Sequence, residues 1–202
     1  MAAIDTLRLN LRRVDNLIRL YTVNRTAGAG RKDTKTTDLL RAAVVVLHAS
    51  MEDYLRSLRI AHFDAMTAEQ VACIPLVSPD GNPDKGVKKF TFRELYRHKE
   101  RTVGDLMRES LEENLEAFSS YSDVGQVITT LQTLGINDEA LSQEDRSILQ
   151  EMIKRRHNIV HKADRNQQRG QGNYRTKSIG PKTVESYVGA VKALVRSFGE
   201  EV

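Results

Sequence analysis

Apolar residues recur at helical spacing along most of this chain, and this pattern constrains its fold class more than any other feature. The first run follows the i, i+3, i+4, i+7 rule of an amphipathic helix and comprises Ile4, Leu7, Leu11, Val14, Ile18 and Tyr21. A second run lies between residues 37 and 63 and is apolar all round at 42–47, which is typical of a central helix. Internal repeats and long heptad runs are absent from the sequence. The pattern predicts an all-α, up-and-down helical bundle.

Capping residues predict where the other helices begin and end. Thr67 with Gln70 resembles a capping box of a short helix, and Thr91 with Glu94 resembles one that opens a charged helical stretch to about residue 118. Residues 124–134 form a shorter predicted helix, which ends at a glycine. A long helix is predicted at about 142–165, opened by Ser142 with Asp145, and a closing helix at about 181–199, opened by Pro181. Prolines and glycines at 75–86 predict an irregular excursion, for which a lid, a dimer arm and disorder all stay open.

Length and composition favour one intracellular domain. A chain of 202 residues with 40% hydrophobic content can bury a good core, so we expect a single domain over residues 1–202. The sequence has neither an apolar run long enough for a membrane span nor an N-terminal apolar segment typical of a secretory signal. We therefore expect a cytoplasmic protein. The lone Cys73 cannot form an internal disulfide, and packing is its expected role.

The positive charge of the chain is concentrated near its C-terminal end. The net charge is +4, yet residues 154–182 carry nine Lys and Arg against one acid, Asp164. Such a local field attracts polyanions such as nucleic acid. A solvated basic face is the commoner explanation of a basic run, so charge alone does not identify a partner.

An arginine interrupts the apolar stripe of the 142–165 helix. After Ile148, Leu149, Met152 and Ile153, the next position of the stripe is occupied by Arg156. Burying a guanidinium without a partner costs several kcal/mol, so Arg156 is either paired inside the protein or open at a cleft or subunit interface. Glu52 on the central helix is a candidate partner, and such a pair would also fix the rotamer of the arginine. Nearby His48 is expected to be a packed or hydrogen-bonded core histidine.

The residues around Arg156 could support acid–base chemistry on a phosphodiester. His157 and Asn158 share a helix face with His161, whereas Arg156 lies about 140° away on an ideal helix and reaches the same place only because arginine is long. Cleavage of RNA by its own 2′-hydroxyl needs a base, a cation for the phosphorane and an acid, but no metal. Two other interpretations remain. Basic residues near a helix C-terminus offset its dipole, and His157 with His161 could bind zinc, although no HExxH glutamate or neighbouring cysteine is present.

The string RRHNIVHKADRN at residues 155–166 resembles the signature of the HEPN superfamily, in which four to six residues separate an arginine from a histidine. Here Arg156 and His161 flank HNIV. The longer pattern, with the polar loop, Ser178-Ile179 and the closing helix, resembles the RiboL-PSP type in particular, and residues 43–55 are similar to the central helix of that family. Residues 65–135 match no part of the pattern, so the resemblance covers about half of the chain.

The resemblance implies a helical bundle that dimerises with the signature helices of two protomers in contact. Many HEPN proteins are metal-independent endoribonucleases of toxin–antitoxin pairs, phage defence or RNA processing, and others are inactive nucleotide-binding or scaffolding modules. Carried over, Arg156 would clamp the phosphate and His161 would be the catalytic histidine, with His157 or Asn158 as the polar helper. Two copies of His161 would supply the base and the acid.

We therefore expect an endoribonuclease that leaves 2′,3′-cyclic phosphate ends and needs no metal or other cofactor. Glu52 and Asp164 are expected to support the site. RNA would be gripped by a set of basic and aromatic residues: Arg155, Lys162, Arg165, Arg169, Tyr174, Arg175 and Lys177. Expected partners are RNA, a second copy of the chain, and an antitoxin or other defence protein. The alternatives are a non-catalytic RNA- or nucleotide-binding module in a larger complex, and a purely structural or antitoxin-like bundle.

Overall fold

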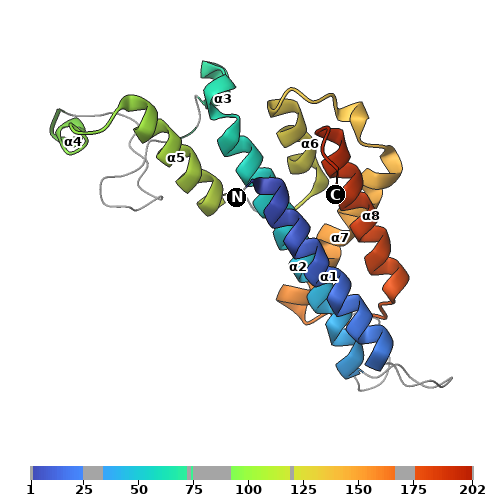
Figure 1. The fold of residues 1–202 in the computed structure, drawn as a ribbon. Coiled ribbons are helices and arrows are strands. Elements are labelled where there is room, and N and C mark those ends of the chain that lie inside the picture. The colour runs from blue at the N-terminus through green and yellow to red at the C-terminus, as the bar shows by residue number, and fades with distance from the viewer. Residues whose placement is uncertain are drawn as a thin grey trace. The chain divides into compact units, whose positions relative to one another are not determined.

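The computed structural model describes residues 2–24, 34–71, 74, 92–118, 121–166 and 176–201. These residues fall into two compact units, one formed by Met1–Tyr54 with Tyr121–Val202 and the other by Leu55–Ser120. Within the described ranges the regular structure is helical (Figure 1), apart from an isolated antiparallel bridge between Arg165 and Thr176. The all-α prediction is confirmed. The single domain over 1–202 stays a prediction, and both Cys73 and the 75–86 excursion lie outside the described residues.

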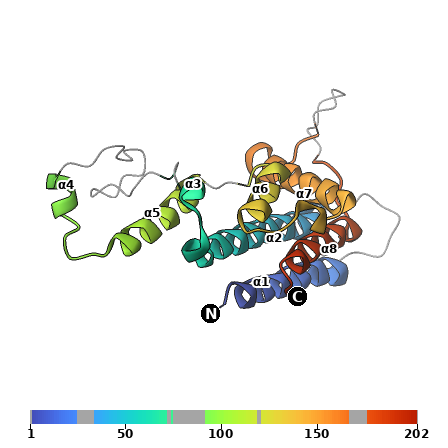
Figure 2. The same cartoon turned by 90° about the horizontal axis from the view of Figure 1, so that it is seen from above.

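The first unit contains α1 (Ala3–Asn24), α2 (Thr34–Ala61) as far as Tyr54, α6 (Val124–Thr133), the 3-10 turn η3 (Asp138–Ala140), α7 (Gln143–Lys162) and α8 (Pro181–Ser197). Helix α8 packs against both α7 and α1, and α6 packs against α7, as Figure 2 shows from above. The predicted stripe of α1 is buried from Leu7 onward. The middle of α2 is not buried all round, because Ala42 is exposed and Val45 and Val46 are partly exposed.

The ends of these helices follow their capping residues. Asp123 accepts a hydrogen bond from the Gln126 amide at the start of α6, and Gly135 has a φ of 74° just after its end, a left-handed conformation that suits glycine. Ser142 accepts from the Asp145 amide at the start of α7, and Pro181 opens α8. These predicted starts are confirmed.

The second unit contains the end of α2, the 3-10 turn η1 (Phe63–Ala65), α3 (Ala68–Val71), α4 (Phe92–Tyr96) and α5 (Val103–Phe118). The capping box of the short helix α3 is confirmed, since the Thr67 amide donates to the Gln70 side chain at 2.8 Å. The predicted continuous helix to residue 118 is wrong. It is interrupted after Tyr96, because Thr102 caps a new helix by accepting from the Asp105 amide at 3.1 Å.

Among the described residues, no helix is both long enough and apolar enough to cross a membrane.

Candidate functional site

The four residues expected to carry catalysis lie in the C-terminal part of α7. Arg156 and Asn158 are partly buried, whereas His157 and His161 are exposed. The two imidazole rings lie one turn apart with their centroids separated by 4.7 Å and their planes inclined by 44°. The exposed surface at the end of α7 therefore presents two adjacent titratable rings.

Arg156 makes no hydrogen bond or ion pair with any residue that the structure describes. The expected pair with Glu52 is wrong: the buried Glu52 carboxylate lies beside His48, with 3.4 Å between Oε2 and Nδ1. The other ring nitrogen of His48 lies 3.3 Å from the Tyr121 carbonyl oxygen. His48 is thus the buried, hydrogen-bonded core histidine that the sequence predicted.

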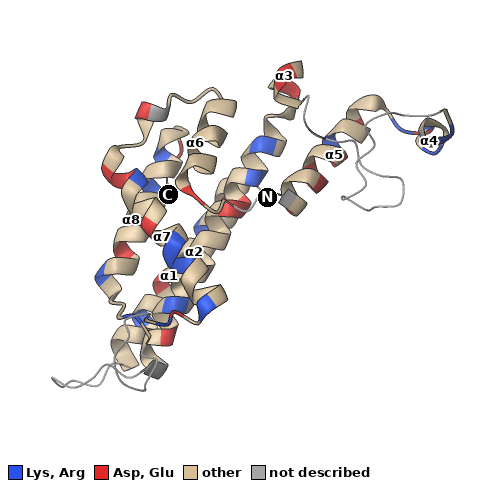
Figure 3. Cartoon of the chain, turned by 180° about the vertical axis from the view of Figure 1, so that it is seen from behind, with Lys and Arg blue, Asp and Glu red and all other residues tan. Residues whose placement is uncertain are grey.

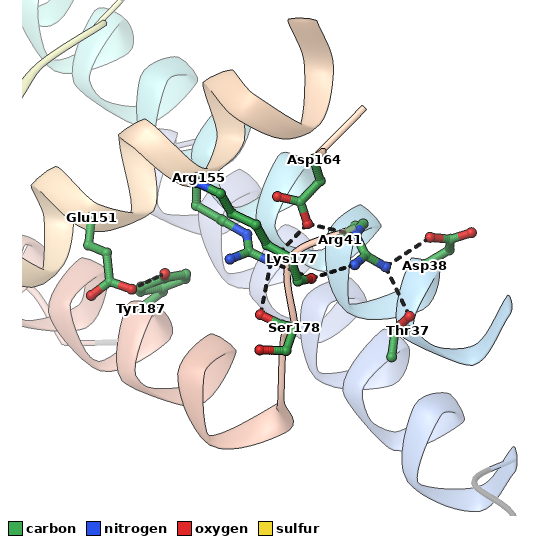
Figure 4. A network of polar contacts seen from close by, with 9 residues as sticks. All are labelled: Thr37, Asp38, Arg41, Glu151, Arg155, Asp164, Lys177, Ser178 and Tyr187. Atoms are coloured by element: carbon green, nitrogen blue, oxygen red, sulfur yellow. Dashed lines mark hydrogen bonds and ion pairs between the residues drawn. The ribbon is translucent and has the colours of Figure 1, made fainter. Parts of the chain in front are cut away.

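The neighbouring arginine is held inside the protein (Figure 4). Nη2 of Arg155 donates to Oδ2 of Asp164 at 2.8 Å and to the Lys177 and Ser178 carbonyl oxygens, both at 3.1 Å. Nε of Arg41, on α2, donates to the same Asp164 oxygen at 2.8 Å, and its Nη2 donates to the Lys177 carbonyl at 2.8 Å. We call Arg41, Arg155 and Asp164 the buried cluster. It ties α2, the end of α7 and the segment before α8 together.

The buried cluster is shielded from water and is completed by residues of α2. The Asp164 side chain is 0% exposed, that of Arg41 is 9% exposed and that of Arg155 is 15% exposed. Nη1 of Arg41 donates to the Thr37 hydroxyl at 2.9 Å and to the Asp38 carboxylate at 3.1 Å. Two guanidiniums donate to Oδ2 of Asp164, which offsets much of the cost of burying these charges. Oδ1 of Asp164 and Nε of Arg155 are buried and have no hydrogen-bond partner among the described residues.

The structure distinguishes two arginines that both fit the signature spacing. Five residues separate Arg155 from His161 and four separate Arg156 from it, so spacing alone does not choose between them. Nη2 of Arg155 donates to acceptors inside the protein, so this arginine has a structural role. Its expected contact with RNA stays a prediction. Asp164, expected to support the site, bonds the two arginines of the buried cluster and not Arg156 or His161.

The remaining expected RNA contacts are only partly visible. Lys162 and Arg165 are exposed at the end of α7, and Lys177 is partly exposed; Figure 3 shows basic residues along the C-terminal half of α7. Arg169, Tyr174 and Arg175 lie outside the described residues. Within the described ranges, no group of three or more His, Cys, Asp or Glu side chains could hold a metal ion.

Sequence reasoning missed Arg41. The residue follows two leucines and precedes an apolar run on α2, and a charge in that position signals a buried partner. That signal was present, but it could not identify Asp164, which lies 123 positions away.

A buried tyrosine also joins α8 to α7. The Tyr187 hydroxyl donates to the Glu151 carboxylate at 2.8 Å. Burial, followed by this hydrogen bond, raises the pKa of Tyr187 well above its ordinary value. The contact joins α8 to the helix that carries the candidate catalytic residues.

A family comparison covers nearly the whole chain. The model of the RiboL-PSP-HEPN family matches residues 9–202, so the match extends through the 65–135 stretch that the sequence pattern left unassigned. Neither a curated protein nor a solved structure shows a significant match. A match of this extent, together with the helical architecture, shows that the chain belongs to the RiboL-PSP-HEPN family.

Proposed function

We propose that this protein is a metal-independent endoribonuclease that cleaves RNA with Arg156 and His161. The observation that carries the proposal is a difference in bonding between the two adjacent arginines of α7. Arg155 bonds inward to Asp164, whereas Arg156 has no partner among the described residues and lies on the same helix end as two exposed imidazoles. Membership of a family that includes ribonucleases supports it.

The proposed reaction is an internal transesterification. His161 removes the proton of the 2′-hydroxyl, and the resulting oxygen forms a bond to the adjacent phosphorus. Arg156 stabilises the charge that develops on the non-bridging oxygens. The bond to the 5′-oxygen breaks and a second imidazole protonates the leaving group. The products carry a 2′,3′-cyclic phosphate and a 5′-hydroxyl, and no electron transfer or metal is involved.

The proposed reaction needs a second imidazole to protonate the leaving group. His161 of a second copy is the expected acid, and Val160 beside it is 49% exposed, which leaves an apolar side chain for a protomer contact. His157 is favoured over Asn158 as the polar helper, because the His157 ring lies 4.7 Å from that of His161. Lys162, Arg165 and Lys177 then contact neighbouring phosphates.

The test is RNA cleavage by the purified full chain in the presence of EDTA. We expect products with 2′,3′-cyclic phosphate ends, and a loss of about 100-fold or more in rate for both Arg156→Ala and His161→Ala, since each removes a group that acts in the transition state. Lys154→Ala is the matched control, because it removes an exposed basic residue of the same helix, and it should retain nearly full activity.

Two results would contradict the proposal. RNA binding without cleavage would favour the non-catalytic binding module. Cleavage that requires a divalent cation, or that survives in His161→Ala, would exclude the assigned mechanism. If the enzyme also acts as a toxin or defence nuclease, expression of the intact chain should slow cell growth while the His161→Ala chain should not.

A further inference from the structure

The last turn of α7 is unusual in how it ends. Ala163 and Asp164 have φ values of 47° and 53°, a left-handed conformation that residues with side chains rarely adopt. The Asp164 amide donates to the Asn158 carbonyl at 2.9 Å, which closes the helix at Lys162. His161 therefore lies two positions before a left-handed backbone turn.

Local sequence does not explain this ending. Residues 163–166 read Ala-Asp-Arg-Asn and contain neither glycine nor proline, and alanine is the strongest helix former. The sequence alone predicted a helix to about residue 165, whereas α7 ends at Lys162. Strained backbone persists where surrounding contacts determine it, and here those contacts are the bonds from Arg41 and Arg155 to the buried Asp164 side chain.

Two residues of the buried cluster, Arg155 and Asp164 (Figure 4), flank the segment 156–161 that carries the candidate catalytic residues. Arg155 lies immediately before Arg156, and Asp164 lies three residues after His161. Asp164, at one end of this segment, accepts hydrogen bonds from Arg155 at the other end and from Arg41 on α2. The Asp164 carbonyl also accepts from the Lys177 amide at 2.8 Å, which fixes the chain that leaves the turn.

We infer that Arg41, Arg155 and Asp164 are positioning residues that end α7 at Lys162 and thereby hold His161 in the orientation that RNA cleavage requires. The effect on RNA cleavage rests on the proposed function, whereas the positioning of the His161 side chain is a structural property that can be tested without it. Arg41, which lies on a different helix and has no resolved contact with His161, acts on it through Asp164.

The test compares Asp164→Asn and Arg41→Lys with Tyr187→Phe. The first keeps the shape of the side chain but removes its charge, and the second keeps the charge but removes the planar fork of donors. Tyr187→Phe removes the hydrogen bond to Glu151. It is the matched control because it weakens the α7 and α8 pair and removes none of the hydrogen bonds of the buried cluster. Far-ultraviolet circular dichroism checks that each variant folds.

Two measurements are made on each folded variant. Nuclear Overhauser contacts between the His157 and His161 rings report their geometry without any need for activity, and kcat and KM are determined separately on RNA. We expect Asp164→Asn and Arg41→Lys to weaken the ring contact and to lower kcat by about 100-fold, as expected for a misplaced reacting group, with KM changed by less than about threefold. Tyr187→Phe should lower the melting temperature and leave both readouts at the wild-type level.

The inference is overturned if folded Asp164→Asn and Arg41→Lys keep the wild-type ring contact, or if Tyr187→Phe loses it to the same extent. If Asp164→Asn fails to fold, Arg41→Lys decides, because the buried charge of Asp164 keeps a cationic partner in that variant. A wild-type chain that does not cleave RNA refutes the proposed function, and the ring contacts then still decide whether the buried cluster positions His161.

Discussion

The two adjacent arginines of α7 should differ sharply in what they contribute to stability. In Arg155→Ala the protein loses bonds from one Nη2 atom to three acceptors, of which the closest is Asp164 at 2.8 Å. A hydrogen bond to a charged group contributes about 1.5–3 kcal/mol, and breaking a buried ion pair costs about 3–5 kcal/mol. Because Asp164 keeps Arg41 as a partner, we expect a loss of about 2–3 kcal/mol.

Arg156→Ala should behave differently. Arg156 makes no polar contact with any described residue, so its removal should change the free energy of unfolding by about 0.5 kcal/mol or less. The chain contains no tryptophan, so unfolding in urea is best followed by far-ultraviolet circular dichroism. For a chain of this size the loss in Arg155→Ala corresponds to a fall in melting temperature of about 4 to 12 °C.

The result that would refute this reasoning is equal stability of the two variants, or a larger loss in Arg156→Ala. Either result would mean that Arg155 is not the structural arginine and that the two residues have been assigned to the wrong roles. The m-value must stay constant between variants, because a change in m indicates a change in the surface exposed on unfolding and not in the buried cluster alone.

Two further predictions concern titration and capping. Burial and a hydrogen-bonded carboxylate raise the pKa of both Tyr54 and Tyr187 above the ordinary tyrosine value of 10.0. The stability that follows from this shift is fully present below that unfolded-state value and is lost as pH rises above it. The urea midpoint should therefore fall at alkaline pH, and a double Tyr→Phe variant should flatten that fall; a midpoint with the same pH dependence in both proteins would contradict the assignment. Thr102→Ala should destabilise α5 by about 1 kcal/mol and speed amide hydrogen exchange in its first turn, since the Thr102 hydroxyl accepts from the Asp105 amide; unchanged exchange there would show that this cap contributes nothing.

The sequence by itself determined the helical class and most helix boundaries, because the information for both is local. Apolar residues three and four positions apart identify a buried helix face, as the residues of α1 confirm. The side chains of Ser142 and Asp123 accept short-range hydrogen bonds from backbone amides and so fix the helix starts that the sequence predicted. Where the prediction joined α4 and α5, the interrupting signal was also local: Thr102 with Asp105 was present in the sequence and was overlooked.

Only the tertiary structure decided which of the two arginines bonds to Asp164. Arg155 and Arg156 have the same chemistry and nearly the same spacing from His161, and the partner that separates them is assembled from α2, the turn after α7 and the segment before α8. The end of α7 was decided in the same way, since Asp164 adopts a left-handed conformation while its side chain is held by an arginine 123 positions away. Helix periodicity records which residues share a face, but the pairing of buried charges depends on which elements the fold brings together.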